Sequence, residues 1–215
     1  MKRIFLVFLI VLVTVVGCKD LTRKNQSSDK IDKSAKKEEV RNNIILPNYA
    51  LWTLSRLTME ETNNNLTYNE KQEFILSRTS TTETAYVSLN NIAVTYGNDY
   101  RISIIVKKAT LGNLFGLRII GEYPNRIDAV FDLKKGLLKE VVDVGDFLSG
   151  EGLIEDMGNG WFKCSLKGEV YADKIKIILG PTSGLGRTIT WEGPTSDKCN
   201  NYIIPTSLTL EEILY

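Results

Sequence analysis

Acid–base catalysis has few candidate residues in this chain. Its 215 residues include no histidine, so the commonest general base is missing, as are the usual catalytic triads and most transition-metal sites. Asp and Glu number 26, and two neighbouring carboxylates could hydrolyse a glycosidic bond. Sequence spacing identifies no such pair. We therefore expect a protein that is not an enzyme, with a glycan-active enzyme as the open alternative.

Recognition chemistry has better candidates. An aromatic ring on a concave surface can stack on the apolar face of a sugar while polar side chains hydrogen-bond to its hydroxyl groups. Trp161 is our candidate for that ring, and Arg118, Asp128 and Lys163 are candidates to share its face. The alternative is that all three tryptophans pack in the interior, as large aromatic side chains commonly do.

Two of the three cysteines lie late in the chain. If the protein is exported, Cys164 and Cys199 meet oxidising conditions and could form a disulfide. Pairing requires Cα atoms within about 7 Å of each other. We favour the alternative, in which Cys164 is buried and Cys199 is unpaired in an exposed loop.

The N-terminus has the pattern of an export signal. Lys2 and Arg3 precede an apolar run, residues 4–16, that only Thr14 interrupts. A helix of this length extends roughly 20 Å, too short to cross a hydrocarbon core of about 30 Å. We therefore interpret residues 1–17 as a signal peptide rather than as a membrane span.

The end of this run, Val15-Val16-Gly17-Cys18, resembles a bacterial lipobox. The resemblance implies cleavage after Gly17 and a diacylglycerol on the Cys18 thiol, with acyl chains such as palmitate. Acyl chains stabilise membrane binding by about 0.8 kcal/mol for each buried CH₂. Lys19 rather than Asp follows the cysteine, which resembles the sorting pattern for the outer membrane. We expect a lipid-anchored protein of the bacterial cell envelope, in the outer membrane.

Residues 18–42 have the composition of a flexible tether. Most are Asn, Gln, Ser, Lys, Asp or Glu, and few large apolar side chains offset the entropy of ordering them. Residues 19–43 carry 8 Lys and Arg against 5 Asp and Glu, whereas residues 44–215 carry 17 against 21, a net charge of −4. A net acidic folded part argues against nucleic-acid binding, which needs a clustered basic surface.

From Asn43 onward, short β-branched and aromatic runs alternate with polar residues. Apolar side chains repeat with a period of two in residues 100–107, 126–133 and 174–179. Further runs raise the count to at least seven strands: residues 84–89, 114–120, 161–166 and 187–191. This pattern predicts an all-β fold for residues 43–215, an antiparallel β-sandwich.

A tight turn is expected at Gly158-Asn159-Gly160, because Asn and Gly tolerate positive φ. The next strand then begins at Trp161. By alternation Trp161 and Lys163 point away from the core, and the side chains that point into it are Phe162, Cys164 and Leu166.

Several segments together carry a family resemblance. They are Trp52-Thr53, residues 100–108, Gly116-Leu-Arg118, Ala129-Val-Phe-Asp-Leu133 with Gly136, residues 154–165, Thr190-Trp191-Glu192 and Asn201-Tyr-Ile-Ile-Pro-Thr206. They resemble a jelly-roll family found in phage tail and structural proteins and in carbohydrate-binding modules. The match covers nearly all of residues 43–206 in order, its most specific part is residues 158–164, and it departs from the family at residues 193–198.

The resemblance implies a jelly-roll β-sandwich that binds rather than catalyses, with a polysaccharide or surface glycan as its ligand. The alternative is a structural or protein-interaction module of the envelope or of phage-derived origin. An exposed apolar patch would favour the alternative, and a concave polar face with one ring would favour a sugar. Related modules often hold a structural calcium. Glu192 and Asp197 offer oxygen ligands, but no ligand loop has recognisable spacing, so we assign no metal and no cofactor.

Overall fold

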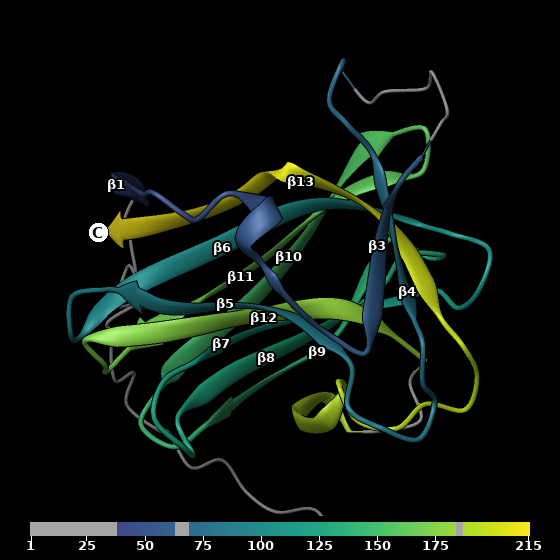
Figure 1. The fold of residues 1–215 in the computed structure, drawn as a ribbon. Coiled ribbons are helices and arrows are strands. Elements are labelled where there is room, and N and C mark those ends of the chain that lie inside the picture. Colours follow the sequence, from purple (N-terminus) through teal and green to yellow (C-terminus); the bar gives the residue numbers. More distant parts are fainter. Residues whose placement is uncertain (1–37, 63–68, 184–186) are drawn as a thin grey trace, which may run out of the picture. The chain divides into compact units, whose positions relative to one another are not determined.

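The chain forms a sandwich of two antiparallel β-sheets (Figure 1). The structure, a computed structural model, describes residues 38–62, 69–183 and 187–215. These residues belong to the second of two units of the chain, Lys37–Tyr215. The predicted signal peptide, Cys18 and most of the predicted tether lie outside the described residues. Among the described residues, no helix has the length and apolar character needed to cross a membrane.

Each sheet combines strands from distant parts of the chain. The first sheet contains, in spatial order, β10 (Leu148–Gly158), β11 (Trp161–Val170), β6 (Asn98–Lys108), β13 (Asn200–Leu214), β4 (Phe74–Arg78) and β3 (Leu57–Glu61), with β1 (Glu39–Ile44) paired to β13. The second contains β2 (Thr53–Ser55), β5 (Tyr86–Ala93), β12 (Lys174–Thr182), β7 (Leu114–Ile120), β8 (Arg126–Asp132) and β9 (Leu137–Val144). The repeated crossing between sheets, for example from β5 to β6 to β7, confirms the predicted jelly-roll sandwich.

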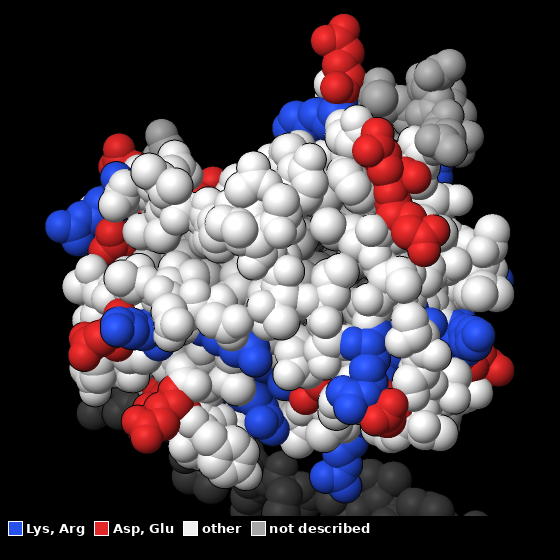
Figure 2. Space-filling view, viewed as in Figure 1, with Lys and Arg blue, Asp and Glu red and all other residues white. Residues whose placement is uncertain are grey.

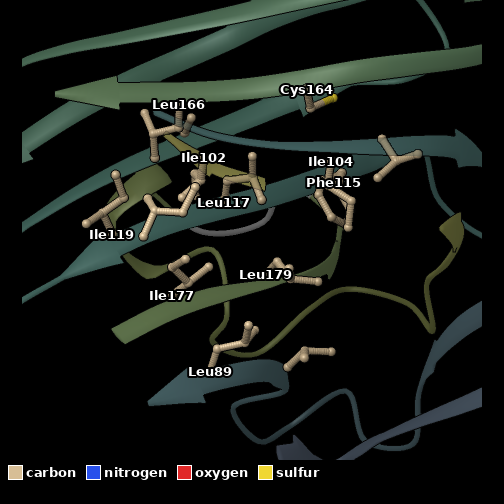
Figure 3. Close-up of a cluster of buried hydrophobic side chains, with 14 of the residues drawn as sticks. Leu89, Ile102, Ile104, Phe115, Leu117, Ile119, Cys164, Leu166, Ile177 and Leu179 are labelled. Carbon is tan, nitrogen blue, oxygen red and sulfur yellow. The ribbon is translucent and has the colours of Figure 1, made fainter. Parts of the chain in front are cut away.

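The core lies between the sheets and is built by the predicted alternation. On β6 the side chains at positions 100, 102, 104 and 106 are all fully buried. The alternate apolar positions of β8 and β12 are buried in the same way, and Figure 3 shows side chains from several strands meeting in one cluster. Burying one such aliphatic side chain contributes about 1.5–3 kcal/mol, so this cluster is the main source of the sandwich's stability.

The hairpin between β10 and β11 has the predicted turn. Gly158, Asn159 and Gly160 all have positive φ, at 82°, 54° and 77°. Only glycine and a few polar residues adopt this conformation readily, which explains the sequence at the turn. The turn starts β11 at Trp161, so Cys164 and Leu166 point into the core as predicted.

Two sequence predictions are corrected. Residues 187–191 do not form a strand, because η2 (Thr188–Thr190) is a short 3₁₀ helix held by side-chain contacts to the outer face of the second sheet. Strand β1 starts at Glu39, inside the segment that the sequence predicts to be a tether. Five of the six residues of β1 are exposed, so it lacks the apolar alternation that identifies a strand, and main-chain pairing with β13 holds it in place.

Residues 45–52 form a strap from β1 of the first sheet to β2 of the second. The strap contains the 3₁₀ helix η1 (Tyr49–Leu51), visible in Figure 1 between β13 and β12. The Asn48 side chain accepts a hydrogen bond from the Ala50 amide at 2.9 Å, and the Trp52 indole donates to the Pro47 carbonyl at 3.3 Å. These local bonds fix the path of the strap over the side of the sandwich.

Candidate functional site

The four predicted site residues do not form one site. Arg118 lies on β7 and Asp128 on β8, both in the second sheet, whereas Trp161 and Lys163 lie on β11 in the first. The prediction that they share a face is therefore wrong. Alternation gives the face of a residue on its own strand, but it does not give the sheet to which that strand belongs.

Arg118 and Asp128 form a buried ion pair, with 3% and 0% of their side chains exposed. The Arg118 guanidinium also donates to both carboxylate oxygens of Glu192, each at 2.8 Å, and to the Ile189 carbonyl at 2.8 Å. Burial raises the pKa of Asp128 to about 6 although the neighbouring Arg118 opposes the shift. The Arg118 guanidinium is held by these contacts, and both members of the ion pair are closed to solvent, so their role is structural.

The ion pair anchors the segment that follows β12. Trp191 packs on the outer face of the second sheet with Leu114, Val130 and Ile178. On the inner side of the sandwich, a second buried arginine, Arg78, donates to four main-chain carbonyls, those of residues 83, 181, 192 and 193. The buried guanidinium groups of Arg118 and Arg78 thus hold residues 192 and 193, at the end of this segment. The sequence of the segment shows no regular alternation.

Trp161 and Lys163 lie on the outward face of β11, as predicted. The Trp161 side chain is only 4% exposed, and the Lys107 ammonium lies 5.6 Å from its ring centroid. Lys163 is paired with Glu155 at 3.7 Å. The Trp161 ring is therefore not presented to solvent, and the prediction that it forms an open sugar platform is wrong.

Both described cysteines, Cys164 and Cys199, are unpaired and buried. Cys164 lies in the core on β11, as expected. Cys199 is 2% exposed rather than in an exposed loop, because the main chain there pairs with β4: the Arg78 amide donates to the Cys199 carbonyl at 3.0 Å. Burial raises the pKa of both thiols, that of Cys199 to about 11.

A groove of about 530 Å³ lies between the strap and the middle of β13. Its volume is within the range of small-ligand sites. Tyr49 and Trp52 provide aromatic lining, and the exposed polar side chains at its edge are Asn43, Asn48, Thr206 and Thr209. No Asp, Glu, Lys or Arg lines this groove.

The aromatic lining is rigid. The Tyr49 ring packs edge-on against Trp52, with centroids 6.4 Å apart, and against Phe74 at 5.3 Å. Trp52 and Phe74 are both 8% exposed and belong to the core. Because these rings are fixed before any ligand arrives, binding at the groove would lose little side-chain entropy.

The first sheet has a different surface across β6, β10 and β11. A smaller hollow of about 260 Å³ is lined by Glu38, Arg101, Glu151 and Lys167. The Lys167 ammonium contacts Glu151 at 2.9 Å and the Tyr215 hydroxyl at 2.7 Å. Burial alone would lower the pKa of Lys167, but its bonds to Glu38, Tyr215 and Glu151 outweigh burial and raise it. The charged side chains of this hollow pair with one another, so they are not available to a ligand. The uncharged groove is therefore the better ligand site.

Among the described residues, no group of three or more His, Cys, Asp or Glu is arranged to hold a metal ion. Glu192, one of the two predicted oxygen ligands for calcium, uses both carboxylate oxygens to bind Arg118.

The groove was not predicted from the sequence, although a signal for it exists. Beyond the N-terminal apolar run, the three longest stretches without Asp, Glu, Lys or Arg are residues 84–98, 42–55 and 199–210. The second contains the strap, and the third contains the part of β13 that faces it. In a chain with 25% charged residues, a long uncharged stretch indicates either buried core or an uncharged surface. Residues 42–55 and 199–210 contain both buried core residues and exposed residues at the edge of the groove.

Comparisons with known proteins give only distant similarity. No family model and no curated protein matches the chain. A β-1,3-glucan-binding CBM6 of Bacillus halodurans is 9% identical, over 81% of this chain and 98% of that protein, with a TM-score of 0.41. The CBM22-1–GH10 modules of endo-1,4-β-D-xylanase 10B of Clostridium thermocellum, complexed with xylohexaose, are 13% identical over 79% of this chain, with a TM-score of 0.43. The match covers 27% of that second chain, and similarity this low assigns neither a family nor a ligand.

Proposed function

We propose that this protein is a non-catalytic binding module for an uncharged polysaccharide, held at the bacterial outer membrane by a lipid on Cys18. The observation that supports the ligand class is the groove between the strap and β13. Its lining combines fixed aromatic rings with amide and hydroxyl side chains and carries no charge. Sugar rings have apolar faces and hydroxyl edges, and this lining can satisfy both without desolvating a charge.

The surface around the groove supports the same ligand class. Figure 2 shows that the part of the molecule over η1 is free of charged side chains, which gather toward the margins of this face. An acidic polysaccharide or a nucleic acid would gain no electrostatic attraction there. The groove therefore favours a neutral glucan, xylan or mannan over an anionic polymer.

The binding test is a pull-down of the full-length chain, solubilised in detergent, on insoluble glucan, xylan and mannan, with alginate as the anionic comparison. We expect saturable binding to a neutral polymer that the free oligosaccharide competes away. Tyr49→Ala removes the ring from the groove, and Tyr96→Ala, which changes a tyrosine that does not line the groove, is its matched control. Loss of binding in both variants, or in neither, would count against the groove as the site.

A second pair of variants guards against a folding defect, since Tyr49 contacts core residues. Asn43→Ala and Thr206→Val change exposed side chains at the edge of the groove and leave the core intact. We expect the double variant to weaken binding about tenfold, because each hydrogen bond to a ligand that is lost contributes about 0.5–1.5 kcal/mol. Unchanged binding by this double variant, with unchanged melting, would exclude the edge of the groove from the ligand site.

One observation favours a protein partner as the second candidate. Ile45 and Leu51 on the strap are 95% and 75% exposed, beside the groove. Exposed apolar residues in a cluster mark interaction surfaces. The variant Leu51→Asn distinguishes the two, because Leu51 does not line the groove: a protein partner requires this side chain, whereas a sugar in the groove does not. Loss of envelope crosslinks with intact polysaccharide binding would support the protein partner.

The anchor is tested separately. Cys18→Ser removes the thiol to which the lipid would be attached. We expect metabolic palmitate labelling of the wild-type protein and none of the variant, together with movement of the variant from the outer-membrane fraction to the soluble fraction. Equal labelling of both proteins would disprove the anchor at this residue.

A further inference from the structure

The groove has a neighbour on the other side of the strap. A second hollow, of about 460 Å³, lies between residues 44–47 and residues 90–93 of β5. It shares Ile44, Leu46 and Pro47 with the groove, so the two adjoin along the start of the strap. The second hollow also has no charged side chain in its lining.

A third hollow continues in the same direction. It has a volume of about 280 Å³ and shares Asn90 and Asn91 with the second. Its other walls are residues 120–122 at the end of β7 and residues 174–176 of β12. The three hollows therefore follow one another from β13 in the first sheet to the ends of β5, β12 and β7 in the second. We call this row of hollows the track.

A β-bulge lies at the junction of the second and third hollows. Leu89 pairs with Ile177 and Ile92 with Ile175, so two residues of β5 stand opposite one residue of β12. Those two are Asn90 and Asn91, both exposed, and Asn91 has a φ of 58°. A bulge interrupts the ladder and reorients side chains, and asparagine tolerates this backbone conformation. The bulge therefore presents two amide side chains along the track.

The sequence supports the same continuity. The longest stretch without charge after the N-terminal run, residues 84–98, contains the bulge, and the next two longest line the groove. Three uncharged stretches that are far apart in the chain thus meet along one path. Charged side chains, those of Glu122, Lys174 and Lys176, enter only at the third hollow.

We infer that the track binds a linear, uncharged polysaccharide along its chain, over several sugar units, rather than a single terminal sugar. This inference rests on the proposed function. The groove binds the first units on its aromatic lining, and the amides of Asn90 and Asn91 hydrogen-bond to units farther along. An amide both donates and accepts, as successive sugar hydroxyl groups require. A short oligosaccharide that fills the groove would not reach the bulge.

Chain length is the variable that tests the track. The affinity of the full-length protein in detergent is measured by calorimetry for two-unit and six-unit oligosaccharides of β-1,3-glucan, cellulose, xylan and mannan. For the polymer type that binds, we expect the six-unit ligand to bind at least tenfold more tightly than the two-unit ligand. Equal affinity for the two lengths would overturn the track and leave the groove as a site for short sugars.

The bulge provides the matching variant. Asn90→Ala with Asn91→Gly removes both amides, and glycine accepts the positive φ at position 91 without strain. We expect the affinity for the six-unit ligand to fall about tenfold, with the two-unit affinity unchanged. Asn159→Gly is the control, because Asn159 is also exposed, also has positive φ, and lies in the β10–β11 turn away from the track.

The outcomes separate this inference from the proposed function. If both lengths bind equally and the bulge variant changes neither affinity, the track is wrong, while loss of both affinities in Tyr49→Ala still supports the groove. If no oligosaccharide and no neutral polymer binds to the folded wild-type chain, the proposed function fails and the track fails with it.

Discussion

The indole ring of Trp191 lies directly on the main chain of Gly116. A Cβ atom at Gly116 would come within 2.2 Å of Trp191 Cδ2 and 2.4 Å of its Cε3. No real Cβ contact is this short, so the ring occupies the space that any side chain at position 116 would need. The contact explains a glycine in the middle of β7, where glycine is otherwise unfavourable.

Gly116→Ala should destabilise the domain by about 1–3 kcal/mol, because the added methyl group displaces a packed ring. The measurement is urea unfolding followed by tryptophan fluorescence. In a Trp191→Ala background the same substitution should cost much less, since the space is then free. Equal costs in the two backgrounds would mean that the ring does not restrict position 116.

Arg78→Met should destabilise the domain far more than Arg56→Met. Arg78 is 3% exposed, and its loss leaves buried carbonyl groups without their donor, each at a cost of about 1–3 kcal/mol. Arg56 is 45% exposed in its pair with Glu83, a kind of pair that contributes less than about 1 kcal/mol. Thermal melting compares the two variants, and similar melting temperatures would contradict a clamping role for Arg78.

Asp128 should make the domain less stable as pH rises from about 4 to 6. Its pKa is raised from 3.8 to about 6 by burial, so the folded state holds the proton more tightly than the unfolded state does. The resulting stabilisation is complete below the unfolded pKa and is lost as pH rises through the folded pKa. The groups that face this carboxylate are Arg118, Arg126 and Glu192.

The test for Asp128 compares the melting temperatures of the wild-type protein and Asp128→Asn at each pH. The difference, wild type minus variant, should decrease from pH 4 to pH 6.5. Asp132→Asn is the opposite case, because hydrogen bonds from Asn113 and from the amides of residues 134 and 135 outweigh burial and lower the Asp132 pKa. For that variant the difference should increase with pH. The same trend in both variants would refute the assignment.

Both described cysteines should be inert in the folded protein. Burial raises the pKa of Cys199 to about 11 and the pKa of Cys164 well above its usual value, so little of either thiol is ionised at neutral pH. A thiol reagent at pH 8 should label neither Cys164 nor Cys199 until denaturant is added, and mass should show no disulfide. Rapid labelling of either native thiol would show that it is accessible.

The strands could be predicted from the sequence because their alternation follows from burial. Residues 100–107 have one apolar face, and that face is buried between the sheets. β1 gives no such pattern, because five of its six residues are exposed and it is held by main-chain pairing with β13 and by the Arg41–Glu212 ion pair. Residues 187–191 resemble a strand, but the buried charge of Arg118 and the ring of Trp191 hold them across the sheet instead.

The site was harder to predict than the fold, for a physical reason. Arg118, Asp128 and Trp161 have the right chemistry for sugar recognition, but each is buried. For Arg118 the covering segment is the one around η2, which packs over the outer face of the second sheet and gives no local signal of doing so. The groove depends on the approach of the strap to β13, between residues about 160 positions apart. Such a distant approach has no local signal beyond the uncharged stretches that form it.

The central claim is that the uncharged groove binds a neutral polysaccharide. Its most direct test is the pull-down of wild type, Tyr49→Ala and Tyr96→Ala on insoluble glucan, xylan and mannan, each protein first shown to be folded by its melting curve. We predict that wild type and Tyr96→Ala bind one of these polymers and release it to free oligosaccharide, while Tyr49→Ala does not bind. A folded wild-type protein that binds none of them, or a Tyr49→Ala variant that binds as well as wild type, would contradict the claim.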